Sequence, residues 1–133
     1  MNDEFEPEQL YGTWTLTAAT AEDEYGRPLP PPYGPTPMGS LVLARNGRMM
    51  AVLSDGRPTL PAGEKRAYAS YCGNFRIEQD RLITRVDAAL IAARIGGEQV
   101  RRLELQGDTL ILFPPRRTDG AQRKISWRRI GSD

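Results

Sequence analysis

Apolar and polar residues alternate along short segments of this sequence, which is the pattern of β-strands that bury one face. Within residues 11–19, Trp14, Leu16 and Ala18 alternate with three threonines. Seven further segments of strand length are rich in apolar and β-branched residues: 39–45, 48–53, 74–78, 82–88, 100–106, 109–113 and 123–130. The sequence therefore predicts eight strands, which dominate the fold.

Turn residues separate these strands at short intervals. Asn46-Gly47 lies between two apolar runs, which is the strongest short-range signal of a β-hairpin. Gly107-Asp108 marks a second hairpin in the same way. An all-β chain of mostly antiparallel strands forms either a sandwich or a closed barrel, and closure would leave no exposed sheet edge.

Three segments depart from the strand pattern. Residues 64–71 are the one segment that predicts a helix, of about two turns, and Gly73 can end it. Residues 25–37 contain six prolines, so we expect an extended loop that crosses one end of the fold or acts as a lid. Residues 90–94 are compatible with a strand end or with a single helical turn.

The composition describes an ordinary globular domain. A length of 133 residues fits one domain, which we place at residues 1–133, and 39% hydrophobic residues suffice for a core. Eighteen basic and 17 acidic residues nearly balance, so we expect neither nucleic acid nor a membrane as a partner. Residues 1–9 are acidic rather than basic and then apolar, so we expect no secretory signal and a cytoplasmic location.

The charges are unevenly distributed along the chain. Residues 1–26 carry seven acidic residues and no basic one, which leaves 18 basic and 10 acidic residues in the rest. An acidic first strand beside a basic last strand would fit a sheet that closes on itself. A nucleic-acid-binding patch is the alternative, but the aromatic residues that would stack on bases are missing there, because Trp127 is the one ring after Phe113.

The absence of histidine removes several kinds of chemistry. With no histidine and one cysteine, the chain cannot form a Ser-His-Asp triad, a Cys-His pair, a His-ligated metal site or an internal disulfide. Cys72 has no histidine to activate its thiol, so we interpret it as a small buried residue. We expect no metal, nucleotide or other cofactor.

Six segments, in order along the chain, resemble the bacterial lipocalin-like domain proteins, which belong to the lipocalin and calycin barrels. These segments are Leu10–Leu16 with its Gly-x-Trp motif, Pro37–Leu43, Asn46–Met49, Tyr71–Phe75, Leu105–Leu112 and Ser126–Arg129. The resemblance implies an eight-stranded antiparallel up-and-down barrel whose open end admits a small apolar molecule. It implies no defined activity. Thr84 stands where the family often has a histidine, so no role of that imidazole can be carried over.

The resemblance also implies structural roles for three residues. The indole of Trp14 would plug the closed end of the barrel, and Gly12 would let the backbone pass close to its neighbours. An arginine near the C-terminus, Arg128 or Arg129, would stack on the indole, and we expect Arg129 to have this structural role. Contact of Trp14 with a ligand is the alternative.

Parity along the strands identifies the apolar side chains that would line an interior. The apolar candidates for contact with a ligand are Leu16, Leu41, Leu43, Met50, Phe75 and Leu103. Because neighbours in a strand alternate, one of Met49 and Met50 must face inward. This mainly aliphatic interior suits an apolar ligand, and an interior packed shut by its own side chains is the alternative.

Two arginines are the candidates for a polar contact inside the barrel. We expect Arg48 and Arg101 to reach the interior, where a guanidinium could hold a ligand carboxylate in a bidentate contact. Either arginine could instead pair with Glu104, Asp87 or Asp55 in a purely structural role.

Two tyrosines are the last candidates for ligand contact. Tyr68 and Tyr71 lie three positions apart in the predicted helix, and hence on one of its faces. Their rings would either cover the mouth of the barrel or seat the helix on the sheet.

Three functions from different classes follow from these residues. The first is binding of a small apolar or weakly acidic molecule inside a barrel. The second is a cyclase or isomerase that folds such a molecule into a reactive shape, and the sequence leaves open whether any reaction is catalysed. The third is a solid barrel that serves as a protein-interaction domain. The oligomeric state is open, with a homodimer among the options.

Overall fold

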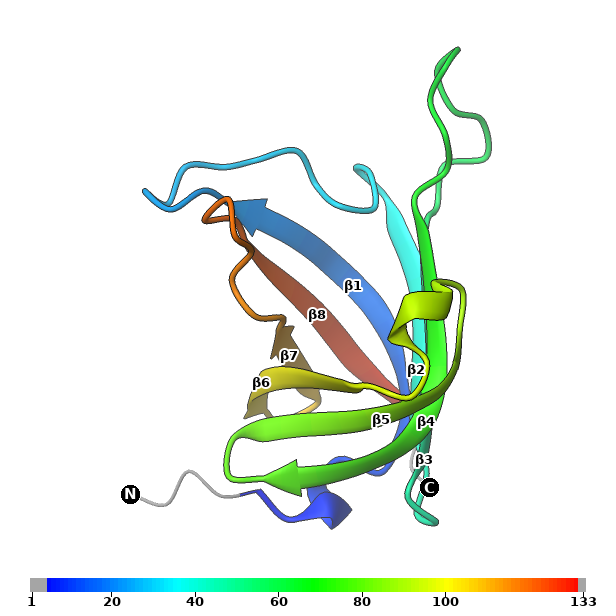
Figure 1. Ribbon diagram of the computed structural model, residues 1–133, viewed down its shortest axis with the longest axis vertical. Coiled ribbons are helices and arrows are strands. Elements are labelled where there is room, and N and C mark those ends of the chain that lie inside the picture. The colour runs from blue at the N-terminus through cyan, green and yellow to red at the C-terminus, as the bar shows by residue number, and fades with distance from the viewer. Residues whose placement is uncertain (1–4, 132–133) are drawn as a thin grey trace.

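The computed structural model describes residues 5–131, so Asp3 and Glu4 of the acidic N-terminal stretch lie outside the described residues. Eight antiparallel strands form a closed barrel in which each strand pairs with its neighbours in sequence (Figure 1). The strands are β1 (Gly12–Glu22), β2 (Pro37–Leu43), β3 (Arg48–Asp55), β4 (Tyr68–Glu78), β5 (Arg81–Ala89), β6 (Glu98–Gln106), β7 (Thr109–Phe113) and β8 (Gln122–Gly131). The predicted all-β, up-and-down barrel is confirmed.

Strand β1 closes the barrel because it pairs on both of its edges. Trp14 lies opposite Leu41 of β2 on one side and opposite Arg129 of β8 on the other. The acidic end of β1 therefore runs beside the basic start of β8, where Glu22 pairs with Gln122 and Ala21 with Arg123. This is the arrangement that the uneven charge distribution indicated.

The inward faces of the strands form one hydrophobic core. Leu41 and Leu43 of β2 are fully buried, as are Trp14 of β1 and Leu110 of β7. On β3, the inward methionine is Met49, and Met50 points outward. One methionine of this pair thus faces the core, as parity requires.

The predicted helix at residues 64–71 is wrong. Tyr68 and Tyr71 belong to β4, and residues 64–67 are irregular. A helix of two turns is marginal without partners, whereas Tyr68 to Cys72 gain ladder hydrogen bonds by pairing with Ser54 to Met50 of β3. Among residues 5–131 the helical turns are two short 3₁₀ turns, η1 (Pro7–Gln9) and η2 (Ala92–Arg94).

The turn η1 and the first residues of β1 cover one end of the barrel, called the closed end here (Figure 1). Leu10 is fully buried, and its carbonyl accepts a hydrogen bond of 3.1 Å from Nε1 of Trp14. The guanidinium of Arg129 lies 4.3 Å from the centroid of the Trp14 ring and donates to the carbonyls of Tyr11 and Gln9. Of the two arginines considered from the sequence, Arg129 lies over the ring.

Gly12 lies at a close approach between β1 and the end of β8. Its φ of 140° is unfavourable for other residues, and a Cβ at this position would overlap the carbonyl oxygen of Gly131. The close passage of the backbone that the resemblance implied for Gly12 is therefore present.

The proline-rich segment between β1 and β2 spans residues 23–36 and crosses the opposite end of the barrel, called the open end here (Figure 1). The amide of Leu29 donates to the carbonyl of Ala21, which ties the start of this loop to β1. Further along, Tyr33 packs against the core cluster. The loop therefore forms part of the rim of the open end.

Candidate ligand cavity

A cavity of about 190 Å³ lies at the open end of the barrel. Its walls come from inward positions of five strands and from three of the segments that connect the strands. The lining residues are Tyr33, Leu53, Ala69, Tyr71, Arg94, Arg101, Leu112, Pro114, Pro115, Arg117, Arg123, Ile125 and Trp127. The interior is thus packed in its closed half and hollow in its open half.

The floor of the cavity is apolar. Leu112 of β7 and Ile125 and Trp127 of β8 are buried inward side chains, and Leu53 of β3 adds a fourth. Such a surface favours a hydrocarbon or aromatic group over water.

Four arginines line the same cavity, and no aspartate or glutamate does. Arg101 and Arg123 are half-buried at inward positions of β6 and β8, whereas Arg94 of η2 and Arg117 of the β7–β8 connection are exposed at the rim. None of the four forms an ion pair with another residue in the described range 5–131. The cavity therefore combines an apolar floor with positive charge that the surrounding residues leave uncompensated.

Among residues 5–131, the guanidinium of Arg101 has only neutral hydrogen-bond partners. It donates to the carbonyl of Val100 at 3.1 Å and to Oε1 of Gln99 at 3.0 Å, both neutral acceptors. Burial lowers the pKa of Arg101, Tyr71 and Tyr33 oppose this decrease, and repulsion from Arg94 and Arg123 adds to it. An anion beside Arg101 would offset the burial and the repulsion.

Two tyrosines contribute polar atoms to the walls. Tyr71 projects inward from β4, and burial raises the pKa of its hydroxyl, so this group stays protonated and can donate a hydrogen bond. Tyr33 reaches the cavity from the proline-rich loop. Strand β4 and the proline-rich loop thus both contribute a tyrosine to the cavity wall.

Trp127 has an unusual polar atom for a floor residue. Its side chain is 1% exposed, and Nε1 has no hydrogen-bond partner in the described part of the chain. Nε1 of Trp14, at the closed end, is by contrast paired with Leu10. A buried donor without a partner destabilises the folded state, so Nε1 of Trp127 lowers the free energy of unfolding.

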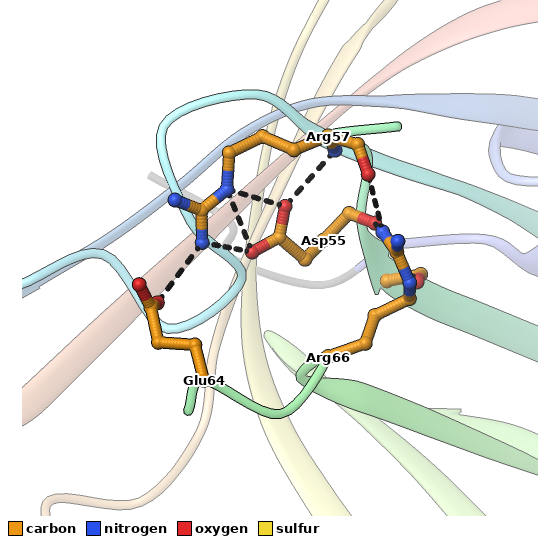
Figure 2. A network of polar contacts seen from close by, with 5 residues as sticks. Asp55, Arg57, Glu64 and Arg66 are labelled. Carbon is orange, nitrogen blue, oxygen red and sulfur yellow. Dashed lines mark hydrogen bonds and ion pairs between the residues drawn. The ribbon is translucent and has the colours of Figure 1, made fainter. Parts of the chain in front are cut away.

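A polar network braces the rim beside the cavity (Figure 2). The Asp55 carboxylate, at the end of β3, accepts hydrogen bonds from the Arg57 guanidinium at 2.6, 3.1 and 3.2 Å. Arg57 also contacts Glu64 at 3.2 Å, and Arg66 donates to the backbone carbonyls of Asp55 and Arg57. The Arg57 guanidinium lowers the pKa of Asp55 to about 2.

This network also touches the proline-rich loop. Gly34 packs against Asp55 so closely that a Cβ at Gly34 would overlap the carboxylate. Because Gly34 directly follows Tyr33, the Asp55 network positions the segment that carries the tyrosine into the cavity wall.

The structure brings together some of the residues singled out from the sequence and separates others. Arg101 and Tyr71 line the cavity. Leu16, Leu41, Leu43 and Leu103 are buried in the core and Phe75 packs against it, and none of these five lines the cavity. Met50 and Tyr68 lie on the outer face of the barrel, with 56% and 46% of their surface exposed.

Arg48 does not reach the interior, which corrects the expectation from the sequence. It lies on the outer face, where its guanidinium contacts the Asp87 carboxylate at 2.5 and 3.2 Å and Asn74 at 3.0 Å. The structural pairing with Asp87, which the sequence left open, is thus the one observed. The thiol of Cys72 lies 3.5 Å from the same carboxylate and is half-buried.

Several cavity residues were missed from the sequence. Arg123 shares parity with Ile125 and Trp127, so the alternation along β8 could have identified it. Arg94 and Arg117 lie in connecting segments, where no periodicity shows which way a side chain points. Comparison of strand parity across the whole barrel would have found only the first of these arginines.

Two further properties of the described range bear on the site. No helix in residues 5–131 is long and apolar enough to cross a membrane. Within the same residues, no group of three or more histidine, cysteine, aspartate or glutamate side chains is placed to hold a metal ion.

Comparison with known proteins agrees with the architecture. No protein with a curated description matches the chain. The family model described as a lipocalin-like domain matches residues 11–130, which include the closed barrel from β1 almost to the end of β8. The eight-stranded barrel, the Gly-x-Trp motif at its closed end and this match lead to one conclusion: the chain belongs to the lipocalin-like domain family.

Proposed function

We propose that this protein binds a small, apolar, weakly acidic organic molecule in the cavity at the open end of the barrel. The observation that carries the proposal is Arg101, a half-buried guanidinium without a carboxylate partner beside an apolar floor. Lipocalin-like barrels commonly hold small hydrophobic ligands, which supports the proposal at a coarser level.

The size of the cavity limits the ligand. Its volume of about 190 Å³ is similar to the ~150 Å³ cavities that take up benzene in engineered proteins. The apolar part of the ligand is therefore one aromatic ring, or a chain of similar bulk, in contact with Leu112, Ile125 and Trp127.

The acidic group of the ligand would point toward Arg101. A hydrogen bond to a charged group contributes about 1.5–3 kcal/mol, and apolar contact contributes about 25 cal/mol per Å² removed from water. After the cost of association is deducted, a ligand that buries about 300 Å² would bind in the micromolar range. Tyr71 can add a hydrogen bond to the same group.

A pair of matched ligands tests this proposal. 4-Isopropylbenzoate and 4-isopropylbenzamide have nearly the same shape, but only the benzoate is charged. Isothermal titration calorimetry should show about tenfold tighter binding of the benzoate, because only the carboxylate gains charge-assisted hydrogen bonds from a guanidinium. Binding of neither compound, or equal binding of both, would contradict the proposal.

Two variants locate the contact. Arg101→Gln should remove most of the preference for the benzoate and leave binding of the amide unchanged. Arg128→Gln is the matched control, because Arg128 is exposed on the outer face of β8 and its loss changes the net charge equally. The control variant should bind both compounds like the natural chain.

A further inference from the structure

The number of guanidinium groups around the cavity says more about the ligand than the presence of Arg101 alone. Building on the proposed function, we infer that the head group of the ligand is a dianion, a phosphate monoester or a phosphonate on a small apolar group. The observation behind this inference is that four arginines and no acidic side chain line one cavity.

The four arginines approach the cavity from different parts of the fold. Arg101 and Arg123 project inward from β6 and β8, and Arg94 and Arg117 stand at the rim on η2 and the β7–β8 connection. Groups spread in this way can surround a tetrahedral head group whose three terminal oxygens point in different directions. A planar carboxylate offers two oxygens in one plane and is satisfied by one or two guanidinium forks.

Some arginines of the barrel form ion pairs, and others, such as Arg66 and Arg128, form none among residues 5–131. The four cavity arginines differ from these others because they line one cavity. Arg48, Arg57, Arg76, Arg102 and Arg129 each form an ion pair with an aspartate or glutamate side chain. The cavity arginines have no such partner in the described residues. A monoanion would neutralise one of these four charges, whereas a dianion would neutralise two and relieve more of their mutual repulsion.

The inference can be tested through pH, because no histidine, cysteine, aspartate or glutamate lines the cavity. Its charged and titratable side chains are Arg94, Arg101, Arg117, Arg123, Tyr33 and Tyr71, and the chain has no histidine. A phosphate monoester gains its second negative charge with a pKa of about 6. A change of affinity between pH 5 and 8 would therefore report the charge of the ligand.

Phenyl phosphate and phenyl sulfate are a suitable pair, since they are nearly isosteric and differ by one charge at pH 8. Calorimetry at pH 8 should show phenyl phosphate binding about tenfold more tightly than phenyl sulfate. At pH 5 the difference should largely disappear, because phenyl phosphate is then mostly a monoanion. Inorganic phosphate should bind much more weakly than phenyl phosphate, because it makes no contact with the apolar floor.

Substitution of Arg94 and Arg117, the two arginines at the rim, tests whether they contact the head group. Arg94→Gln and Arg117→Gln should each lower the phosphate-to-sulfate preference at pH 8 by about threefold or more, with the thermal unfolding temperature unchanged. Arg128→Gln, which removes an exposed arginine of the outer face, should leave the preference intact. An equal loss in Arg128→Gln would show a general effect of net charge and overturn the inference.

The possible failures are distinguishable. If phenyl phosphate and phenyl sulfate bind equally at pH 8, the dianion is excluded while binding of small organic anions stands. If these two compounds and 4-isopropylbenzoate all fail to bind, the proposed function itself fails.

Discussion

Trp14 and Trp127 are both buried almost completely, yet the two indoles have different polar surroundings. Nε1 of Trp14 donates to the Leu10 carbonyl at 3.1 Å, and Arg129 lies 4.3 Å from the ring centroid. Nε1 of Trp127 has no partner in the described chain. The first indole therefore holds the closed end together, and the second contributes mainly apolar surface to the cavity floor.

Substitution of each tryptophan by phenylalanine should separate these roles. Both variants lose part of a buried ring, but Trp14→Phe also loses a hydrogen bond and weakens the cation–π contact, each worth about 0.5–2 kcal/mol. We expect Trp14→Phe to lower the free energy of unfolding by about 1–3 kcal/mol more than Trp127→Phe, as measured by urea denaturation. Equal losses would show that Arg129 and Leu10 contribute little.

Residue parity explains which side chains could be placed from the sequence. Arg101 shares parity with Leu103 and was correctly expected to face inward. In β3, residues 49–53 are apolar at every position, so the alternation that reveals the inward face is absent. Met50 and Arg48 share parity and were both expected to face inward, and the structure places both outside.

At the scale of elements, β4 shows a limit of local patterns. The sequence around Tyr68 and Tyr71 has helical spacing, but pairing with β3 along residues 68–74 decides the conformation. The partners of Tyr68 and Cys72 in β3 are Ser54 and Met50, so a pattern read over a few neighbouring residues does not include the hydrogen bonds of this pairing. The Asn46-Gly47 hairpin was predictable because its turn residues carry the signal themselves, and its Gly47 has a φ of 87°.

The proline-rich loop should matter more for binding than for folding. Replacement of Pro30, Pro31 and Pro32 by glycine would increase the conformational freedom of the loop that holds Tyr33 at the cavity. We expect the affinity for 4-isopropylbenzoate to fall by about threefold to tenfold, with a small decrease in the unfolding temperature.

A control for this loop is available at the opposite end of the barrel. Pro7 lies in η1 at the closed end and does not line the cavity. Its replacement by glycine should leave the affinity unchanged. If both sets of substitutions reduce affinity and stability in proportion, the loop is only structural.

The Asp55 network should make the stability of the rim depend on acidity. The pKa of Asp55 is lowered from its ordinary value of 3.8 to about 2 in the folded chain. A lowered pKa means that the ionised carboxylate stabilises the fold above pH 4, and that this contribution disappears as the pH falls from about 4 to 2. Denaturation curves between pH 2 and 7 should show a smaller decrease for Asp55→Asn than for the natural chain.

Asp80, in the turn between β4 and β5, takes no part in this network and provides the control for the measurement. Asp80→Asn should retain the natural dependence of stability on pH. If the Asp55→Asn curve is parallel to both others, the ion pair with Arg57 contributes no stability.

At the scale of the whole molecule, the barrel divides into a packed half and a hollow half. The closed half contains the sequence motifs, with Gly12 and Trp14 on β1 and Arg129 on β8, so its architecture could be predicted. The walls of the open half depend on side chains from connecting segments, such as Arg94 and Arg117, whose directions depend on the folded chain. The barrel was therefore predictable, while most of its cavity was not.

The whole molecule also determines how binding responds to pH. The chain contains no histidine, and the cavity is lined by arginine and tyrosine without any carboxylate, so its charge is constant near neutrality. A benzoate is fully ionised above pH 6. We therefore expect the affinity for 4-isopropylbenzoate to change less than twofold between pH 6 and 8, as measured by calorimetry. A larger change would require a titrating group in the ligand contacts, and would place the bound carboxylate away from these four arginines.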